Sequence, residues 1–259
     1  MIVPVLIFSF ALLIIQCEKE PDPNDPVDIP DQHFLNALIE DGVDANGDGL
    51  ISVGEAETVT TIYLDPDSVS KSKGKVSSLD GIEAFINLDT LHCCDNQVQE
   101  LDLSANGELR VLICWNNDKN VQLAHLNVSK NRKLEFISIP GNQLTDLDVS
   151  NCSSLHKLMC SYNRLTNLDV SKNTNLGRLW CDGNQLSRLD ISNNINLGKP
   201  SGNEPSWIVG IGLPLSLGDM PTLTEVCVWT LPFPPTGFYG FEIVTTGSPN
   251  IFFTKNCSK

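Results

Sequence analysis

The chain has 259 residues and a formal net charge of -15 at pH 7, so its length permits one large domain or two small ones. The excess of acidic residues argues against nucleic acid, whose phosphates require a basic face, and against anionic membrane surfaces as electrostatic partners. The charge suits a secreted protein that self-repulsion keeps soluble.

Residues 1–17 have the pattern of a secretion signal. The run from Ile2 to Ile15 is largely apolar and shorter than the roughly 20 residues of a membrane span, but it has the length of a signal-peptide core. The stretch LIIQC, which ends at Cys17, resembles a bacterial lipobox, although Gln16 stands where Gly or Ala is usual and no Lys or Arg precedes the run. The resemblance implies that Cys17 is acylated and that the protein is an outer-membrane or cell-surface lipoprotein. The alternative is an ordinary signal peptide of a secreted protein.

Residues 18–31 (EKEPDPNDPVDIPD) alternate proline with acidic residues and contain almost nothing to bury. This composition predicts a stiff, solvated tether. A tether between a lipid anchor and a domain would hold the domain clear of the headgroups.

A helical pattern begins at Asp31, which is suited to cap a helix, and has an apolar stripe that includes Phe34 and Leu38. The stretch DANGDGLISVGE, residues 44–55, follows it and fits the EF-hand loop at each diagnostic position. The expected oxygen ligands are the side chains of Asp44, Asn46, Asp48 and Glu55, the carbonyl of Leu50, and Ser52 through a water.

Calcium binding is therefore predicted for residues 44–55, and the alternative is a polar turn rich in Asp, Asn and Gly. The segment resembles the single-loop calcium segments of dockerin-like and other extracellular modules. Because only one copy is present, we expect a structural clamp that is filled at extracellular calcium concentrations.

Five similar units follow, and they begin at Leu88, Leu109, Leu134, Leu155 and Leu176. Each unit approximates L-x-x-L-x-C-x-x-N-x-L-x-x-L-D-V-S-x-N, mostly in steps of 21 residues. This is similar to the leucine-rich repeat pattern, and the resemblance covers residues 59–196. It implies a β-rich solenoid in which the first, fourth and sixth residues of each unit point inward, in short strands that stack into a parallel sheet. We expect the second half of each unit to be extended too, with few or no helices.

The ends of a solenoid need caps. Residues 32–87 are expected to form a short helical N-terminal cap with the calcium loop, a first degenerate strand near Ile62 and a helical turn before Leu88. The repeats occupy residues 88–197. Residues 198–259 are expected to begin as a loop rich in Gly and Pro, and then to supply a last strand near Val226 and a β cap.

Nine cysteines are present. Cys93, Cys114, Cys160 and Cys181 occupy the sixth place of the repeat, where the remaining unit has Ile139, so we interpret them as small core residues. The alternative is a metal cluster with His92 or His156. Cys227 and Cys257 lie outside this series, and a disulfide between them is predicted, because an oxidising compartment permits it.

The acidic residues of the second half of each unit also recur, at Asp102, Asp148, Asp169 and Asp190. They could gather cations, but we favour bonds to the backbone N–H groups of the following turn. No nucleophile elbow, zinc-binding helix or phosphate loop is found in the sequence, so we predict that the protein is not an enzyme.

Several outward positions of the repeat carry large apolar residues that the core does not require. These residues are Val111, Ile113, Trp115, Phe136, Met159, Tyr162 and Trp180. A row of exposed aromatic residues is typical of an interface centre, so we predict that this sheet face binds a protein or a glycan. The alternative is that a terminal segment folds over these residues.

The chain thus resembles bacterial, Bacteroidota-type surface lipoproteins with leucine-rich repeats. This resemblance implies a non-enzymatic, surface-anchored protein that mediates protein–protein recognition or adhesion, with Ca²⁺ as its cofactor. The alternative is a glycan-binding or dockerin-like accessory protein in carbohydrate use.

Overall fold

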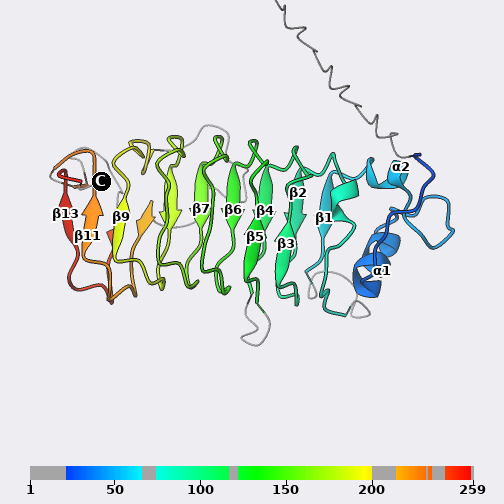
Figure 1. Ribbon diagram of the computed structural model, residues 1–259, viewed down its shortest axis with the longest axis horizontal. Helices are drawn as coiled ribbons and strands as arrows, with labels where there is room; N and C mark the ends of the chain where they lie inside the picture. Colours follow the sequence, from blue (N-terminus) through cyan, green and yellow to red (C-terminus); the bar gives the residue numbers. More distant parts are fainter. Residues whose placement is uncertain are drawn as a thin grey trace, which may run out of the picture.

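The computed structural model describes residues 22–65, 74–116, 122–199, 214–231, 233–234 and 243–257. Cys17 lies outside these residues. The elements are α1 (Gln32–Glu40), α2 (Val53–Ala56), β1 (Thr61–Tyr63), η1 (Ile82–Ala84), β2 (Thr90–His92), β3 (Glu100–Asp102), β4 (Val111–Ile113), β5 (His125–Asn127), β6 (Phe136–Ser138), β7 (Lys157–Met159), β8 (Arg178–Trp180), β9 (Arg188–Asp190), β10 (Leu215–Ser216), β11 (Glu225–Cys227), β12 (Ile243–Val244) and β13 (Phe252–Thr254). Figure 1 shows the strands following one another along the long axis, with α1 and α2 at one end.

The main sheet is parallel and eight-stranded, in the order β1-β2-β4-β6-β7-β8-β10-β12. The fourth residues of successive units are direct partners in it: Leu91, Leu112, Ile137, Leu158 and Leu179. All five are fully buried. The chain is therefore a parallel β-solenoid of the leucine-rich repeat type, and the predicted apolar spine is confirmed.

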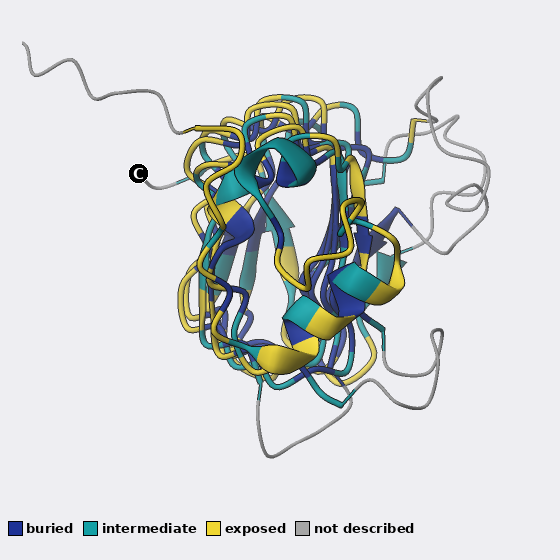
Figure 2. Ribbon diagram, turned by 90° about the vertical axis from the view of Figure 1, so that its right-hand side faces the viewer, coloured by how far each residue is buried: buried dark blue, intermediate teal, exposed yellow. Residues whose placement is uncertain are grey.

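The second halves of the coils form the opposite wall, as strand pairs in the sheets β3-β5 and β13-β11-β9. Residues 88–116 and 122–197 contain no helix, so the predicted narrow coil is confirmed for the part of the repeats that the structure describes. Figure 2 looks along the stack from the helical end and shows the coils superposed into one flattened ring. A single apolar core fills this ring, from Phe34 in α1 to Val228 after β11.

Buried asparagines satisfy the backbone at one turn of each coil. Asn163 donates to the carbonyl oxygens of Ile139 and Cys160, each at 3.0 Å, and its Oδ1 accepts from the N–H of Leu144 at 3.1 Å. The equivalent asparagines are Asn96, Asn142 and Asn184, and all are buried. The side chain thus links neighbouring coils at a bend where the backbone groups have no strand partner.

A second asparagine ladder stands at the other turn; its residues are the last Asn of the repeat pattern, but their hydrogen-bonding role was not predicted. Its members are Asn106, Asn131, Asn173 and Asn194. Asn173, for example, donates to the carbonyls of Val149 and Cys152 at 2.9 and 3.0 Å. Cys152 takes the asparagine's place in the remaining coil, and its Sγ lies 3.8 Å from the carbonyl oxygen of Val128.

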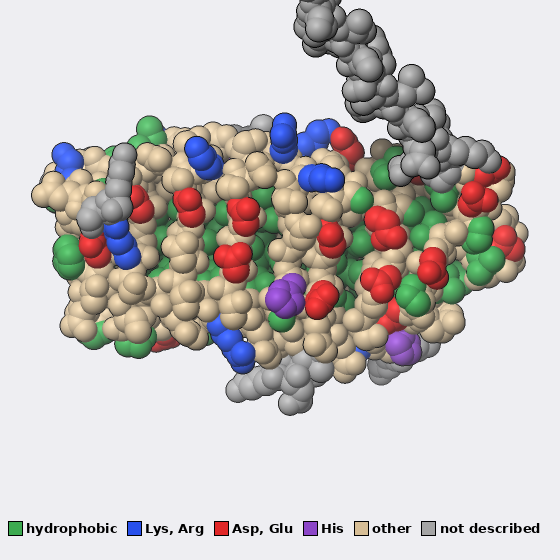
Figure 3. All heavy atoms as spheres, viewed as in Figure 1, with side chains coloured by type: hydrophobic (Ala, Val, Ile, Leu, Met, Phe, Trp, Pro, Cys, Tyr) green, Lys and Arg blue, Asp and Glu red, His purple; other side chains and the backbone are tan. Residues whose placement is uncertain are grey.

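The recurring acidic residues of the repeat accept hydrogen bonds from the backbone of the following turn. Oδ1 of Asp148 accepts from the N–H of Ser150 at 2.9 Å, and the same bond recurs at Asp102, Asp169 and Asp190. Hydrogen bonds from Ser150 lower the pKa of Asp148, so the carboxylate stays charged. The interpretation as turn-stabilising residues is therefore confirmed. Acidic side chains recur along the whole face in Figure 3.

The repeat cysteines are core residues. Cys93, Cys114, Cys160 and Cys181 are buried and unbridged. Burial raises the pKa of Cys160 to about 12, which keeps it a neutral thiol. The structure also contains the predicted Cys227–Cys257 disulfide, whose Cα atoms are 5.6 Å apart.

The prediction of a solvated tether over residues 18–31 is wrong for its second half. The N–H of Val27 donates to the carbonyl of Ile51 at 2.8 Å, and the backbone carbonyl of Asp25 accepts from the N–H of Val53 at 2.9 Å. Ile29 is buried in the core. The segment is short of apolar side chains, but its backbone pairs with the calcium-type loop, which composition does not reveal.

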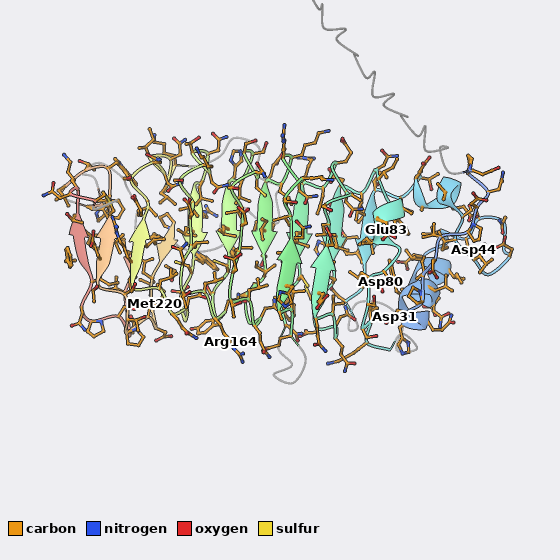
Figure 4. The ribbon with its side chains drawn as sticks, viewed as in Figure 1. Asp31, Asp44, Asp80, Glu83, Arg164 and Met220 are labelled. Carbon is orange, nitrogen blue, oxygen red and sulfur yellow. A yellow bond between two sulfur atoms is a disulfide. The ribbon has the colours of Figure 1, made fainter. Side chains whose placement is uncertain are left out.

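Asp31 fixes the helical cap to the solenoid. One carboxylate oxygen caps α1 by accepting from the N–H of Phe34 at 3.0 Å, and the other accepts from the N–H of Ser77 at 2.8 Å. Burial raises the pKa of Asp31, but hydrogen bonds from Ser77, Phe34 and Ser78 outweigh burial and lower the pKa to about 2. Figure 4 shows Asp31 at the start of α1, close to the segment that contains Asp80 and Glu83.

The expected loop after residue 197 is wrong for Leu215–Ser216, because β10 pairs with β8 and adds a coil to the main sheet. In this coil Met220 stands where other coils have asparagine, along the same edge as Arg164 in Figure 4. Ser248 of the next coil substitutes for the amide: its hydroxyl donates to the Leu217 carbonyl and accepts from the Met220 N–H, each at 2.8 Å. β12 and β13 then form the predicted β cap.

Candidate functional site

The calcium-type loop has the backbone of a tight polar turn. Gly47 and Gly49 have φ angles of +76° and +84°, which side chains disfavour. The two oxygens of Asp44 accept from the N–H groups of Gly47 and Gly49 at 2.8 and 3.0 Å. Asp48 accepts from the N–H of Leu50 at 2.9 Å. The carboxylates are thus held on the inside of the turn, at the outer end of the molecule where Figure 4 labels Asp44.

Four of the six predicted ligand residues line one hollow of about 260 Å³: Asn46, Asp48, Leu50 and Ser52, together with Asn24 and Pro26. Glu55 lies across the loop. One of its oxygens accepts from the N–H of Ala45 at 2.9 Å and the other from the N–H of Ser52 at 2.9 Å. Hydrogen bonds from Ser52 lower the pKa of Glu55.

The carboxylates of Asp44, Asp48 and Glu55 do not form a group of three in which every pair lies within 4.8 Å. Among the described residues, the one group of three His, Cys, Asp or Glu residues that meets this criterion is Asp190, Cys227 and Cys257, and the two cysteines there form the disulfide. The donor set and the glycine turn fit a calcium loop, in which Glu55 already accepts bonds from the loop's own N–H groups.

The predicted binding row is not an open surface. Val111, Ile113, Phe136 and Met159 are buried, with 6 to 8% of their surface exposed. They form a second apolar cluster with Cys94, against which Trp115 and Trp180 pack; we call it the outer cluster. The expectation that these four residues are exposed is wrong: outward side chains of neighbouring, in-register strands pack against one another in this cluster.

Tyr162 differs from the rest of the row, because 58% of its surface is exposed. Its backbone φ is +55°, in the left-handed region that bulky residues avoid. Its hydroxyl donates to the carboxylate of Asp219 at 3.1 Å, two coils along the stack. This hydrogen bond raises the pKa of Tyr162.

Two hollows meet at Tyr162. The first, of about 390 Å³, is lined by Trp180, Asp182, Ser216, Gly218, Asp219, Val244 and Thr246 as well as Tyr162. The second, of about 470 Å³, is lined by Trp115, Asn116, Gln122, Pro140, Gly141 and Asn142 as well as Tyr162. The structure thus brings three predicted aromatic residues, Trp115, Tyr162 and Trp180, to the border of one outer site.

Sequence reasoning missed the polar partners of this site. Asp182 and Asp219 follow β8 and β10 at the turns, and only the position of Asp182 belongs to a unit that the pattern defines. A signal was available at Tyr162, since the same place of the next unit is Gly183 and an aromatic residue there departs from the pattern.

No family model matches the chain, and no curated protein matches it. Similar solved structures include InlJ from Listeria monocytogenes, described as having a cysteine ladder (24% identity, 85% of this chain and 61% of that chain, TM-score 0.36). They also include a leucine-rich repeat protein from Leptospira interrogans (19% identity, 67% and 52%, TM-score 0.42) and ZmpB domains from Clostridium perfringens (28% identity, 36% and 18%, TM-score 0.30). The chain spans 18 to 61% of the length of these three, and their TM-scores are too low to transfer a ligand or partner to it.

Within the described residues, no helix combines the length and the apolar character that crossing a membrane requires.

Proposed function

We propose that the chain is a non-enzymatic recognition protein of the bacterial cell surface or outer membrane, anchored by a lipid on Cys17, and that it binds a protein ligand at the site around Tyr162. The observation that carries the proposal is a half-exposed tyrosine kept in a left-handed backbone conformation between two hollows. Strain of this kind costs about 1 kcal/mol or more and collects at functional sites. A second candidate, a glycan ligand, is favoured by the aromatic borders of the hollows.

The test of this proposal uses Tyr162→Asn, because asparagine tolerates the left-handed backbone. The whole chain is immobilised and probed with a panel of purified bacterial and host surface proteins beside a glycan array. Loss of at least tenfold in capture of a bound protein is expected for Tyr162→Asn. Tyr63→Asn is the matched control, since Tyr63 is 46% exposed on β1 and lies outside both hollows. Equal capture by both variants would remove the Tyr162 site from the proposal.

We propose in addition that residues 44–55 hold Ca²⁺ as a brace for the N-terminal cap. Asp44, Asn46, Asp48 and Glu55 would supply side-chain oxygens, Leu50 its carbonyl, and Ser52 a contact through water. A bound divalent cation would offset most of the negative charge of the loop carboxylates. Backbone bonds already join the loop to residues 25–27, so ordering the loop supports the segment that leads into α1.

Calcium is expected to raise the melting temperature of the wild-type chain and to leave Asp44→Ala and Glu55→Gln unchanged. A ligand at a hundredfold excess over its dissociation constant adds about 2.7 kcal/mol to the free energy of unfolding. Differential scanning calorimetry in EDTA and in millimolar CaCl₂ measures the difference. Asp80→Ala is the control, because it removes an exposed acid outside the loop. An equal calcium response in Asp44→Ala and the wild type would contradict the assignment.

A further inference from the structure

The eighth place of the repeat turns the chain through a left-handed residue in coil after coil. The φ angles there are +52° at Asp95, +72° at Gly141, +55° at Tyr162, +63° at Gly183 and +51° at Asp219. Glycine and aspartate suit this conformation, and tyrosine does not. The turn itself therefore does not require an aromatic residue at position 162.

The next coil makes room for the ring of Tyr162. A Cβ atom at Gly183 would collide with that ring, so glycine is needed there for the ring to lie flat along the stack. The hydroxyl then reaches Asp219. The ring, Trp180 and the carboxylates of Asp182 and Asp219 border one hollow of about 390 Å³, which we call the acidic hollow.

The charges of the acidic hollow have no cationic partner in the described part of the chain. Asp182 accepts from the hydroxyls of Ser161, at 2.8 Å, and Ser216, and from the N–H of Gly218 at 2.9 Å. Asp219 accepts from the hydroxyl of Tyr162. All of these donors are neutral, so two negative charges stand beside two aromatic rings.

A carboxylate pair next to aromatic faces is the environment that an ammonium or guanidinium group prefers, through ion pairing and cation–π attraction. A neutral sugar would use the rings but would leave two carboxylates without counter-charge. The net charge of -15 further favours a basic partner by steering its approach. Lys157 and Arg178, the described basic residues in these two strands, stand at the first positions of β7 and β8. Trp180, which borders the acidic hollow, stands at the last position of β8.

We propose that the acidic hollow receives a lysine or arginine side chain of the protein ligand. This inference rests on the proposed function, in which the Tyr162 site binds a protein. The aromatic rings hold the alkyl stem and the face of the cation, and Asp182 and Asp219 supply its counter-charge. Ser216 and Thr246 add hydroxyl groups at the border.

Asp219→Asn is the sharpest variant for a test. Asparagine tolerates the left-handed backbone, and its carbonyl still accepts from the Tyr162 hydroxyl, so only the charge is lost. Asp146→Asn is the charge-matched control, since Asp146 is exposed and lies outside the acidic hollow. The melting temperature of each variant is recorded first to show that both fold.

The probes are three peptides of one sequence that carry lysine, arginine or norleucine at the same positions, titrated calorimetrically into the whole chain. The lysine and arginine peptides are expected to bind and the norleucine peptide not to bind. Asp219→Asn is expected to weaken binding about tenfold, equivalent to 1.4 kcal/mol, and Asp146→Asn to leave it unchanged. Added salt should weaken the binding further.

Three results would each overturn the inference. The lysine and arginine peptides fail to bind, the norleucine peptide binds equally well, or Asp219→Asn binds as tightly as the wild type. The proposed function is judged separately, by capture of the surface protein. If capture of the surface protein falls in Tyr162→Asn but not in Asp219→Asn, the recognition site stands and the inference of a bound cation does not. If a neutral glycan binds, and its binding is lost in Tyr162→Asn but kept in Asp219→Asn, the ligand of the hollow is a sugar and not a cation.

Discussion

Replacing Asn163 by alanine is expected to lower the free energy of unfolding by about 3 kcal/mol, because a buried hydrogen-bonding group that loses its partner costs about 1–3 kcal/mol. The substitution removes the bonds to the Leu144 N–H and to the carbonyls of Ile139 and Cys160, with a longer one to the carbonyl of Ser161. These groups lie at a bend inside the coil, where water does not replace the amide. Urea unfolding followed by circular dichroism measures the change.

Asn175→Ala is the matched control for this prediction. Asn175 belongs to the same unit and donates to the Ser153 carbonyl at 3.1 Å, but at an exposed position. The expected loss there is below about 0.5 kcal/mol, as for most surface substitutions. Equal losses in the two variants would show that the buried ladder contributes no special stability.

Removing the Cys227–Cys257 disulfide is expected to cost about 3 kcal/mol, from the loop entropy of a bridge that spans a sequence separation of 30 residues. The bridge joins β11 to the segment after β13, so it closes the last coil. That coil has a neighbour on one side only in the sheet order, and it lacks the support that interior coils receive from both sides.

The test compares Cys227→Ser, Cys257→Ser and the double variant in thermal and urea unfolding. If the bridge is the source of the stability, the two single variants and the double variant lose similar amounts, because each removes the same bond. Reducing agent should lower the stability of the wild type and have no further effect on the variants. Additive losses, or a wild type insensitive to reduction, would contradict the prediction.

The spine of the fold could be predicted from the sequence because the period is regular. Leu91, Leu112 and Leu158 recur at fixed places, and one coil cannot bury them alone. The coil of β10 could not be predicted in this way. An insertion precedes it, and Met220 stands where the repeat has asparagine. The hydrogen bonds that the asparagine would make are made by Ser248 in the following coil.

The candidate site was predicted only in part. Periodicity shows which side of the sheet Phe136 and Met159 occupy, but not that neighbours on adjacent strands bury them. It does identify Tyr162 as a departure from the pattern, although the left-handed backbone becomes visible only in the structure. Asp219 could not be assigned, because its coil had no recognisable register.

The pairing of the residue 22–27 segment with the calcium-type loop was also beyond sequence reasoning. The bonds from Val27 and to Asp25 use the backbone, which any residue type can supply. Prolines and acids in this segment indicate disorder only when no partner strand is available.

The one-sided covalent closure of the stack has a mechanical consequence. Tension between the two ends of the chain would act along the row of coils, which pack on one another through non-covalent contacts only. At the C-terminal end, the disulfide opposes separation of the last coil. At the opposite end, hydrogen bonds such as those of Asp31 hold the helical cap, and the described residues there form no disulfide. Under load the protein would therefore unravel from its N-terminal side first and release length in steps of one coil.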